Sequence, residues 1–399
     1  MNIFVINSGS SSIKYQLFKM PSANPVCVGL VERIGLEDAL IIHKTYVEGE
    51  EKVHQFALTI PDHETGLNEV SSLLVNPEFG VLQNTDDIAG VGHRIVHGGD
   101  FFSSTTIITP EVKEKIKETF QLAPLHNPSA YRGIEVAENI FTNAIQVAVF
   151  DTAFHQTMPP QAYRFAIPEL YYTDFNIRSY GFHGTSHKYV SAQANAYLNK
   201  IDSKIISIHL GNGCSITAIK NGESIDTSMG FGPLSGLIMG TRTGDIDPTI
   251  IFYLVNTLGY TVEQVSNLVN KQSGMLGLTG YSDMRDITKA IKEGNQAAKL
   301  AYDMYAYRIK KYIGSYTAIL NGIDAVIFTA GVGENDTMVR QLVCENMEYL
   351  GIAIDAEKNS IRKPGLREIN TSDSKVKVLI VPTNEELEIA NECYKLLDK

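Results

Sequence analysis

The stretch FVINSGSSSIKYQLF, residues 4–18, joins two apolar runs through a turn made of Asn7, Gly9 and four serines. Apolar and β-branched residues on both sides of a Ser/Gly cluster predict a β-hairpin. Such a turn is compatible with a solvated hairpin tip. It is equally compatible with an anion site, because small residues let successive backbone N–H groups approach a phosphate closely. The hairpin alone does not decide between the two.

A second stretch repeats this pattern in the other half of the chain. Without gaps, VINSGSSSI at 5–13 aligns with IHLGNGCSI at 208–216, which matches Ser12 with Ser215 and Ile13 with Ile216. Chance similarity of two turns and duplication of a domain both explain the match. If the domain is duplicated, one hairpin in each copy would form a pincer around a polyphosphate, and Lys14 would add a positive charge beside it.

The rest of the chain alternates between strand and helix patterns, which is typical of an α/β protein. Short β-rich runs lie at 2–7, 12–18, 25–34, 90–96, 146–150, 205–210, 215–219, 325–329 and 376–381. Helical patterns lie at 110–121, 128–140, 186–199, 248–257, 262–270 and 295–320. Residues 384–397 predict an amphipathic closing helix, with Thr383 as its N-cap and acidic residues in its first turn.

Composition and charge exclude several classes of protein. The net charge is −11 and the Lys and Arg residues are scattered, which argues against a nucleic-acid surface. The cysteines lie far apart without C-x-x-C spacing, which predicts reduced core thiols at Cys27, Cys214, Cys344 and Cys393. The start MNIFVINS lacks the pattern of a signal peptide, and apolar runs such as VKVLIVP are too short to span a bilayer. We therefore expect a soluble cytoplasmic protein that binds neither nucleic acid nor membrane.

A third glycine-rich stretch is FTAGVGENDTMVR at 328–340. It predicts a strand that enters a Gly-x-Gly turn and a helix that leaves it along ENDTMVRQLV. Helix N-termini favour nucleotides and other anions, although a purely structural strand-to-helix turn has the same pattern. The sequence contains no G-x-x-x-x-G-K-[ST] loop and no G-x-G-x-x-G placed as in a dinucleotide fold, so both P-loop and Rossmann sites are excluded.

Further segments carry a resemblance to a known family. They are HRIVHGG (93–99), APLHNPSA (123–130), VFDTAFHQTMP (149–159), YGFHGTSH (180–187), MGFGPLSGLIMGTRTGDIDP (229–248) and PTNEELEIA (382–390). With NSGSSSIK and HLGNGCSI, they resemble the acetokinase family in order along essentially the whole chain. The resemblance implies an α/β fold of two duplicated actin-like (ribonuclease H-like) domains with a cleft between them. It implies a first domain of residues 1–151 plus the C-terminal helix 384–399, and a second domain of residues 152–383 carrying most of the nucleotide site.

The family resemblance also implies an activity, with its cofactors and partners. The implied enzyme is a phosphotransferase with a carboxyl group as acceptor, which moves the γ-phosphoryl group of ATP reversibly to acetate and gives ADP and acetyl phosphate. The implied cofactors are ATP or ADP and Mg²⁺, for which Mn²⁺ could substitute. The implied assembly is a homodimer.

The site residues implied by the resemblance fall into four groups. The catalytic group is Arg94, Asp151, His183 and Arg242. The acetate-binding group is Arg94, Val96, Leu125 and Pro233. The metal group is Asn7 and Glu385. The nucleotide group is Ser10, Ser12, Lys14, His209, Leu210, Gly211, Asn212, Gly213, Asp283, Met284, Arg285, Gly331, Val332, Gly333, Glu334 and Asn335.

The chemistry of several of these residues can be argued from their surroundings in the sequence. Arg94 and Arg242 lie among small and apolar residues, where a guanidinium is costly unless it meets a substrate anion or forms a structural salt bridge. Asp151 follows the strand pattern IQVAVF, at the strand end where open α/β sheets keep their sites, although a helix cap is an alternative. We also expect Val96 to share a strand face with Arg94, two residues earlier, and thus to meet the methyl group of acetate.

Two roles are open for Asp151, as a base or as an orienting group. A carboxylic acid substrate with a pKa of about 4.3 is already ionised at pH 7 and has no proton to remove. We therefore expect Asp151 to orient an arginine or a metal-bound water. We also expect direct in-line transfer without a covalent enzyme intermediate.

Two other functions remain compatible with the sequence. A kinase for propionate or butyrate would differ mainly in the size of the pocket around Val96. An actin-like protein that binds a nucleotide or assembles without turnover would need no paired arginines beside a small apolar pocket.

Overall fold

The computed structural model describes residues 1–47 and 49–398, which divide into two compact units. Unit 1 comprises Met1–Phe154 and Asn384–Lys399, and unit 2 comprises His155–Thr383. The division after Phe154 lies close in the chain to the predicted boundary after residue 151. No helix in the described residues is both long and apolar enough to cross a membrane.

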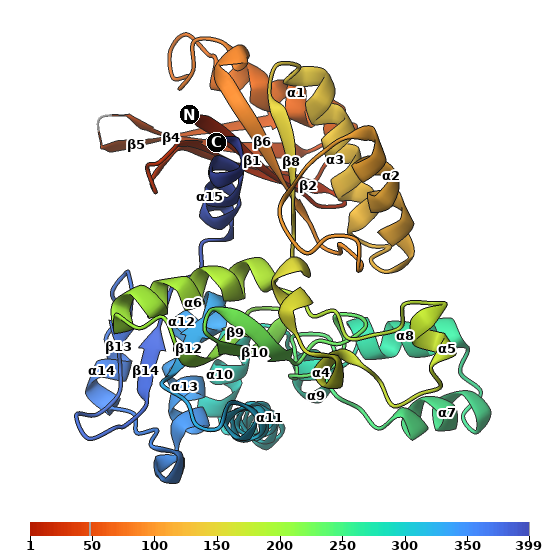
Figure 1. Cartoon of the computed structure of the whole chain (residues 1–399), viewed down its shortest axis with the longest axis vertical. Helices are drawn as coiled ribbons and strands as arrows, with labels where there is room; N and C mark the ends of the chain where they lie inside the picture. The colour runs from red at the N-terminus through yellow and green to blue at the C-terminus, as the bar shows by residue number, and fades with distance from the viewer. Residues whose placement is uncertain (48, 399) are drawn as a thin grey trace. The chain divides into compact units, whose positions relative to one another are not determined.

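Unit 1 is a mixed sheet covered by helices on both faces (Figure 1). The order of its strands is β5-β4-β3-β2-β1-β6-β8-β7. The strands are β1 (Asn2–Ser8), β2 (Ser12–Lys19), β3 (Pro25–Glu32), β4 (Ala39–Val47), β5 (Glu50–Leu58), β6 (Ile88–Ile95), β7 (Thr106–Ile107) and β8 (Ile145–Phe150). The helices are α1 (His63–Leu74), α2 (Pro110–Glu118), α3 (Asn127–Ile140) and α15 (Glu385–Leu397).

One face of this sheet carries the larger core of unit 1. Val91 of β6 belongs to a buried cluster that also contains Val70 of α1 and Val136 of α3. Phe4 and Ile6 of β1 join the same cluster. Because side chains alternate along a strand, the residues before and after Val91 point to the other face.

The opposite face carries α15, the C-terminal helix (Figure 1). A Cβ atom at Gly90 would lie 2.6 Å from Cδ1 of Leu397, and one at Gly92 would lie 2.7 Å from Sγ of Cys393. The two glycines therefore let α15 pack directly on the backbone of β6. Arg94, two residues beyond Gly92, shares this face and points towards α15.

Unit 2 is built around a second mixed sheet, with the strand order β11-β10-β9-β12-β14-β13. The strands are β9 (Lys204–Leu210), β10 (Cys214–Lys220), β11 (Glu223–Thr227), β12 (Ala325–Thr329), β13 (Arg367–Glu368) and β14 (Lys377–Ile380). The helices are α4 (Pro160–Tyr163), α5 (Leu170–Thr173), α6 (Gly184–Leu198), α7 (Pro248–Asn256), α8 (Val262–Lys271), α9 (Gly274–Thr279), α10 (Met284–Lys292), α11 (Gln296–Leu320), α12 (Ala330–Asn335), α13 (Thr337–Cys344) and α14 (Ala356–Ser360).

Helices cover both faces of this sheet as well. Nε2 of His187 in α6 lies 2.7 Å from Oγ of Ser215 in β10. The preceding residue, Cys214, points to the other face, where its Sγ lies 3.2 Å from Oη of Tyr305 in α11. The polar face of β10 thus meets α6 and its apolar face meets α11.

The two sheets share one topology, which confirms the predicted duplication and the α/β fold class. The order β3-β2-β1-β6-β8 in unit 1 matches β11-β10-β9-β12-β14 in unit 2. In both, the first three strands pair antiparallel and the last two pairings are parallel. All four cysteines are free and buried, as predicted.

The gapless alignment that suggested the duplication is nevertheless wrong in register. Ile13 pairs with Ser8 in the first hairpin, whereas Ile216 pairs with Ile208 in the second. The alignment matches Ile208 with Val5, so it can superpose one strand of each hairpin but not both. The reason is the turn: Ser8 and Ile13 enclose residues 9–12, whereas Leu210 and Cys214 enclose only residues 211–213.

Two helix starts also differ from the prediction. The N-cap of α15 is Asn384, whose Oδ1 accepts a hydrogen bond from the backbone N–H of Leu387, and not Thr383. The Gly-x-Gly stretch after β12 is itself helical, because α12 begins at Ala330. A new helix, α13, starts only after Asp336, whose carboxylate accepts bonds from the backbone of residues 338 and 339 and so ends the first helix.

The ribbon formed by β4 and β5 was not predicted from the sequence. His43 and Thr45 are polar residues on the buried face of β4, so the apolar alternation is interrupted. His43 is accommodated there because Oη of Tyr15 lies 2.8 Å from its Nδ1. Tyr15 in turn fits because a Cβ at Gly29 on the neighbouring strand would lie 2.0 Å from its Cζ.

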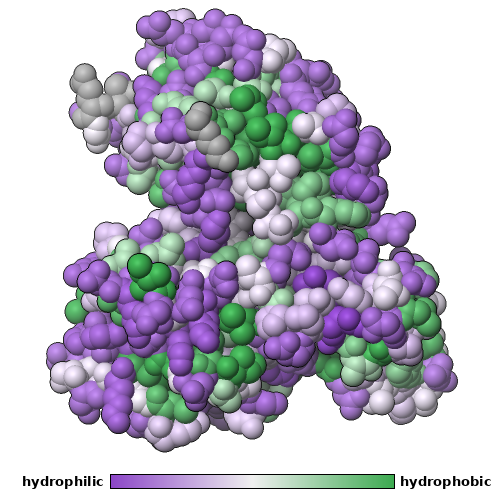
Figure 2. Space-filling view, viewed as in Figure 1, coloured by the Kyte–Doolittle hydropathy of each residue, from purple (hydrophilic) through white to green (hydrophobic). Residues whose placement is uncertain are grey.

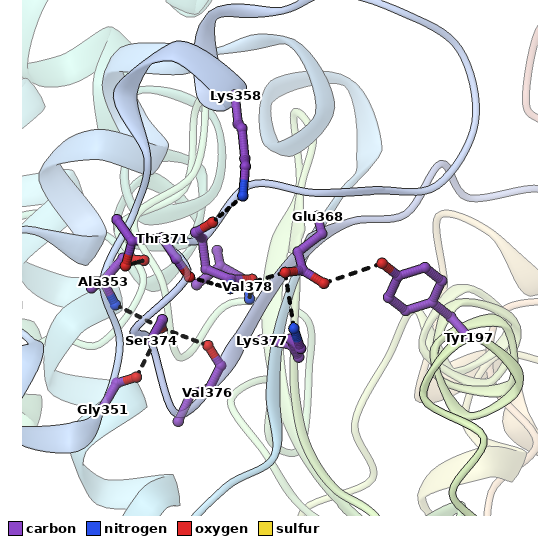
Figure 3. Close-up of polar contacts among 11 residues, drawn as sticks. Tyr197, Gly351, Ala353, Lys358, Glu368, Thr371, Ser374, Val376, Lys377 and Val378 are labelled. Carbon is purple, nitrogen blue, oxygen red and sulfur yellow. Dashed lines mark hydrogen bonds and ion pairs between the residues drawn. The ribbon is translucent and has the colours of Figure 1, made fainter.

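A polar cluster closes the outer edge of the unit 2 sheet (Figure 3). Glu368 on β13 accepts hydrogen bonds from Nζ of Lys377 at 2.9 Å and from Oη of Tyr197 at 3.1 Å. Partial burial opposes ionisation of Glu368, but these bonds outweigh it and lower the pKa of the carboxyl group. The ionised form of Glu368 therefore stabilises the edge.

Replacing Glu368 by Gln should lower the stability at pH 7 by about 0.5 kcal/mol, the scale of a partly exposed ion pair. A folded-state pKa below the unfolded value of about 4.3 adds stability above that pH, which is lost as the pH falls through the folded pKa. The difference in urea midpoint between Glu368→Gln and the parent should therefore shrink below about pH 4.3. Glu223→Gln, at an exposed position of β11 without an ion pair in the described residues, is the control. A pH-independent difference would contradict this account.

Candidate active site

Four of the predicted residues of unit 1 lie where β1, β6 and β8 end, namely Asn7, Arg94, Asp151 and Glu385. Ile6 pairs with His93 in register, so Asn7 and Arg94 follow neighbouring positions of two parallel strands. Asp151 comes directly after β8, whose Phe150 pairs with Ile95. The carboxyl ends of parallel strands in an α/β sheet meet at one edge, which is the usual place for a site. Glu385 reaches this edge from the first turn of α15.

Arg94 is held by two carboxylates at this edge. Its Nη2 lies 2.5 Å from Oδ2 of Asp151, which is 1% exposed, and its Nε lies 3.6 Å from Oε2 of Glu385. Burial disfavours the charged guanidinium, but Asp151 and Glu385 outweigh burial and raise the pKa of Arg94. Arg94 is therefore permanently charged, and Asp151 fixes the direction of its guanidinium.

Glu385 has an unusual environment for a carboxyl group. Burial, together with the nearby carboxylates of Asp151 and Glu386, raises the pKa of Glu385 to about 7, although Arg94 and Lys14 oppose the shift. The first turn of α15 carries further acidic side chains, and the helix dipole stabilises negative charge at this N-terminus. Perturbed carboxyl groups of this kind concentrate at functional sites.

The first hairpin turn lies in the same unit. The backbone N–H of Gly9 donates to the carbonyl of Ser12 at 2.8 Å, which closes the turn. Nε2 of His63, the first residue of α1, donates to the carbonyl of Gly9 at 2.7 Å. Ser10 and Lys14 are exposed and Ser12 is half-buried. The contact of His63 with this turn could not be predicted from sequence, because it joins segments far apart in the chain.

Two predicted residues of unit 1 carry oxygen donors of the kind that Mg²⁺ prefers. In the described residues, no group of three or more His, Cys, Asp or Glu side chains could hold a metal ion. Asn7 and Glu385 nevertheless offer an amide and a carboxylate oxygen. Mg²⁺ is commonly bound through one or two carboxylates with substrate phosphates and water supplying the rest, and oxygen donors of this kind would fit it.

The predicted acetate-binding residues are divided between the units. Val96 and Leu125 lie in unit 1, and Pro233 lies in unit 2. Strand β6 ends at Ile95, so Val96 is half-buried in a bend and the predicted strand face shared with Arg94 is wrong. The chain leaves the sheet at this point. Leu125 is 69% exposed.

In unit 2, His183 has a strained backbone and a well-fixed ring. It adopts a left-handed conformation, φ 57°, which costs a non-glycine residue about 1–2 kcal/mol. The carbonyl of Phe182, just before it, accepts a hydrogen bond from Nε2 of His155 at 3.0 Å. The ring of His183 stacks on that of His209, with centroids 4.2 Å apart. Strain of this kind persists only where the surroundings enforce it, often at functional sites.

The second glycine turn meets His183 and Arg242. A Cβ at Gly213 would lie 3.4 Å from Nε2 of His183 and 3.6 Å from Nη1 of Arg242. Nη1 of Arg242 donates to the carbonyl of Pro233 at 2.9 Å. In the described residues Arg242 makes no ion pair, although it is half-buried and burial lowers the pKa of its guanidinium. The open face of Gly213 is thus bordered by an imidazole and an arginine without an acidic partner.

A cavity of about 1070 Å³ opens beside this turn in unit 2. Its lining includes Gly211, Asn212, Asp283, Met284, Arg285, Gly331, Val332 and Asn335, all of which belong to the predicted nucleotide group. Asp283 is the N-cap of α10. It also forms a bidentate ion pair with Arg285, whose side chain is 90% exposed. The volume and the mixture of glycine backbone and charged groups suit a nucleotide.

Other predicted nucleotide residues do not line the cavity. The carbonyl of Gly333 accepts from the buried guanidinium of Arg340 at 2.8 Å, and Oε1 of Glu334 accepts from the backbone N–H of Thr383 at 3.2 Å. His209 bonds Ser186. These three residues therefore make hydrogen bonds within unit 2 and are not part of the cavity wall.

The cavity also has lining residues that sequence reasoning missed. Thr337 and Met338 begin α13, and Lys292 and Arg362 contribute two positive charges. The Asp336 N-cap pattern before α13 could have located the first pair. Nothing in the local sequence distinguishes Lys292 and Arg362 from ordinary surface residues.

Several known proteins resemble this chain over almost its whole length. Residues 2–391 match the model of the acetokinase family. The chain is 59% identical over 398 residues to a protein of Flavobacterium johnsoniae named acetate kinase, and the match covers 100% of both chains. It resembles the crystal structure of Porphyromonas gingivalis acetate kinase with a TM-score of 0.93 and 44% identity, over 99% of both chains. It resembles a propionate kinase from Francisella tularensis with a TM-score of 0.91 and 41% identity, also over 99% of both chains. The chain therefore belongs to the acetokinase family.

Proposed function

We propose that this kinase transfers the γ-phosphoryl group of ATP reversibly to acetate, giving ADP and acetyl phosphate. The proposal includes Mg²⁺ as the metal and the four predicted groups of site residues. Its support comes from family membership, from the cavity in unit 2 and from the contrasting environments of two arginines.

The observation that carries the proposal is the unpaired guanidinium of Arg242. In the described residues it has no acidic partner, and it borders the same glycine face as Nε2 of His183. A half-buried cation without a counterion is costly unless an anion binds there. A phosphoryl group in transfer carries negative charge on its equatorial oxygens, and preorganised donors stabilise it. Arg242 and His183 are suited to that role.

Arg94 and Asp151 are suited to the acceptor side of the reaction. Because acetate is ionised at neutral pH, it needs a cation and not a base. Arg94 can pair with the acetate carboxylate, and Asp151 keeps its guanidinium in one direction. The tight contact between Asp151 and Arg94 supports an orienting role for Asp151 over proton abstraction.

The chemical step is a direct displacement at phosphorus. A carboxylate oxygen of acetate forms a bond to the γ-phosphorus while the bond from that phosphorus to the bridging oxygen of ADP breaks. The bond's electron pair stays on ADP, and no proton is transferred. When bound, Mg²⁺ supplies positive charge near the phosphate oxygens. Asn7 and Glu385 would hold it, and the nucleotide group would hold the rest of ATP.

Arg242→Ala should lower kcat by roughly 100- to 1000-fold, the usual effect of removing one preorganised donor to a transition state. The fold should persist, because in the described residues the side chain of Arg242 bonds only a carbonyl and a thioether. The assay is trapping of acetyl phosphate with hydroxylamine. Arg308→Ala is the control, since Arg308 is also half-buried and bonded to a carbonyl of unit 2. A folded Arg242→Ala protein with parental turnover would remove Arg242 from the mechanism.

The choice of acid is open to a separate test, because one relative is named a propionate kinase. Val96→Ala should raise the ratio of kcat/KM for propionate over acetate by roughly tenfold, since one methylene in a pocket is worth about 1–3 kcal/mol. Val53→Ala, an exposed position on β5, is the control. A loss of stability with an unchanged ratio would show that Val96 only packs the end of the sheet.

We also infer that the chain forms a homodimer through α7. This helix, PTIIFYLVN, is apolar, yet none of its residues is buried. Phe252 is 62% exposed, and Ile250, Tyr253, Leu258 and Val262 are exposed beside it. Figure 2 shows apolar residues in patches on the visible face, including the region of unit 2 where Figure 1 labels α7 and α8. Contiguous exposed apolar surface of this kind marks an interaction site, and a second copy would bury the same surface on itself.

Phe252→Glu should convert a dimer into a monomer in sedimentation velocity at micromolar concentration, because it places a charge in the proposed interface. Ile201→Glu changes an isolated exposed residue and should leave the dimer intact. A monomeric parent protein, or a Phe252→Glu protein that remains dimeric, would refute the assignment of α7.

A cytoplasmic location is part of the same proposal. The cysteines are free thiols, as expected in a reducing compartment. ATP, the proposed phosphoryl donor, is also available there.

A further inference from the structure

Four polar side chains form a continuous hydrogen-bonded chain inside unit 2 that ends at His183. Oγ of Ser207 on β9 lies 2.8 Å from Nδ1 of His187 on α6. Nε2 of His187 lies 2.7 Å from Oγ of Ser215 on β10, and the same oxygen lies 2.9 Å from Nδ1 of His183. Ser207, His187 and Ser215 belong to none of the predicted site groups.

The number of protons limits how this chain can be arranged. The hydroxyl of Ser215 has one proton and two nitrogen partners, so it donates to one ring and accepts from the other. His187 is completely buried, and burial, with smaller contributions from His155 and His209, lowers its pKa well below the usual range. A neutral imidazole has one N–H donor and one acceptor nitrogen. Only two directions along the chain are therefore self-consistent.

The two directions place the proton of His183 on different ring nitrogens. In the first, Ser207 donates to His187, His187 donates to Ser215, and Ser215 donates to Nδ1 of His183. A neutral His183 then carries its proton on Nε2. In the second direction every bond is reversed, so His183 donates from Nδ1 and Ser207 becomes an acceptor.

Ser207 decides between the two directions. Its side chain is fully buried, and in the described part of the chain His187 is the only hydrogen-bond partner of its hydroxyl. In the second direction this buried O–H would have no acceptor, and a buried donor without a partner is costly. In the first direction every proton between Ser207 and Nδ1 of His183 has an acceptor.

We propose that Ser207, His187 and Ser215 are positioning residues that hold His183 as a neutral imidazole with its proton on Nε2. The proposal rests on the proposed function, in which His183 donates to an oxygen of the transferring phosphoryl group. Nε2 lies beside the open face of Gly213 that Arg242 also borders. The fixed tautomer presents an N–H there. It also removes the lone pair from Nε2, so this nitrogen donates a hydrogen bond and does not attack phosphorus.

The test is nitrogen NMR of the full-length protein labelled with ¹⁵N-histidine at neutral pH. The signals of His183 are assigned by their loss in His183→Gln. We expect a protonated Nε2 and an unprotonated Nδ1 for His183 in the parent protein. A protonated Nδ1, or a charged ring with both nitrogens protonated, would overturn the proposal. Because this spectrum needs no variant in the chain of bonds, the proposal is decided even if such a variant fails to fold.

Two matched serine variants extend the test to Ser215. In Ser215→Ala the signals of His183 should shift towards a mixture of both tautomers. Its kcat should fall roughly ten- to a hundredfold with little change in KM for ATP, as when a functional histidine loses its orienting partner. Ser224→Ala also removes a buried hydroxyl from a buried histidine, since Oγ of Ser224 lies 2.9 Å from Nδ1 of His155. It should leave the tautomer of His183 unchanged. An unchanged tautomer and kcat in Ser215→Ala would contradict the proposal.

The outcome is separable from that of the proposed function. If the parent protein shows the expected tautomer but forms no acetyl phosphate, the function fails and the tautomer assignment stands. If the protein is active but His183 is protonated on Nδ1 or charged, the positioning proposal fails and the function stands.

Discussion

The contact of α15 with the backbone of β6 is the constraint on which the site in unit 1 depends. It exists because positions 90 and 92 are glycines, and a side chain at either would collide with the helix. The close approach brings Glu385, in the first turn of α15, to Arg94, whose other partner is Asp151 at the end of β8. The two carboxylates compensate the charge of the Arg94 guanidinium, and they also fix its orientation before any substrate binds.

In unit 2 the corresponding feature is reversed, although the sheet has the same topology: its site arginine has no carboxylate partner in the described residues. Arg242 is held by a backbone carbonyl and has no ion pair in the described residues, so its charge remains available to a bound anion. Beside it, His183 adopts a left-handed backbone, and its ring is fixed by Ser215 and by stacking on His209. An uncompensated cation and a strained, oriented imidazole are unfavourable for stability alone. The guanidinium and the imidazole become favourable when they donate hydrogen bonds to a phosphoryl group that develops negative charge.

Much of the secondary structure could be predicted from sequence, because it depends on short-range patterns, whereas the candidate site residues came from the resemblance to the acetokinase family. The hairpins at the start of each sheet, the helices on their faces and the free cysteines are as expected. The failures have local physical causes. Polar His43 is buried in β4 because Tyr15, far away in the sequence, lies within hydrogen-bond distance of its Nδ1. Asp336 ends one helix and begins another, and Val96 lies beyond the last residue of β6 rather than on it.

The sequence by itself determined the family, the α/β class, the duplication and the identity of the residues that bear charge or donate hydrogen bonds. These properties are carried by residue type and spacing along the chain. Only the tertiary structure decided which charges compensate one another, so that Arg94 is paired and Arg242 is not. It also decided the direction of the bonds from Ser207 to His183. Both depend on burial and on contacts between residues far apart in sequence, where a single missing acceptor fixes the position of a proton.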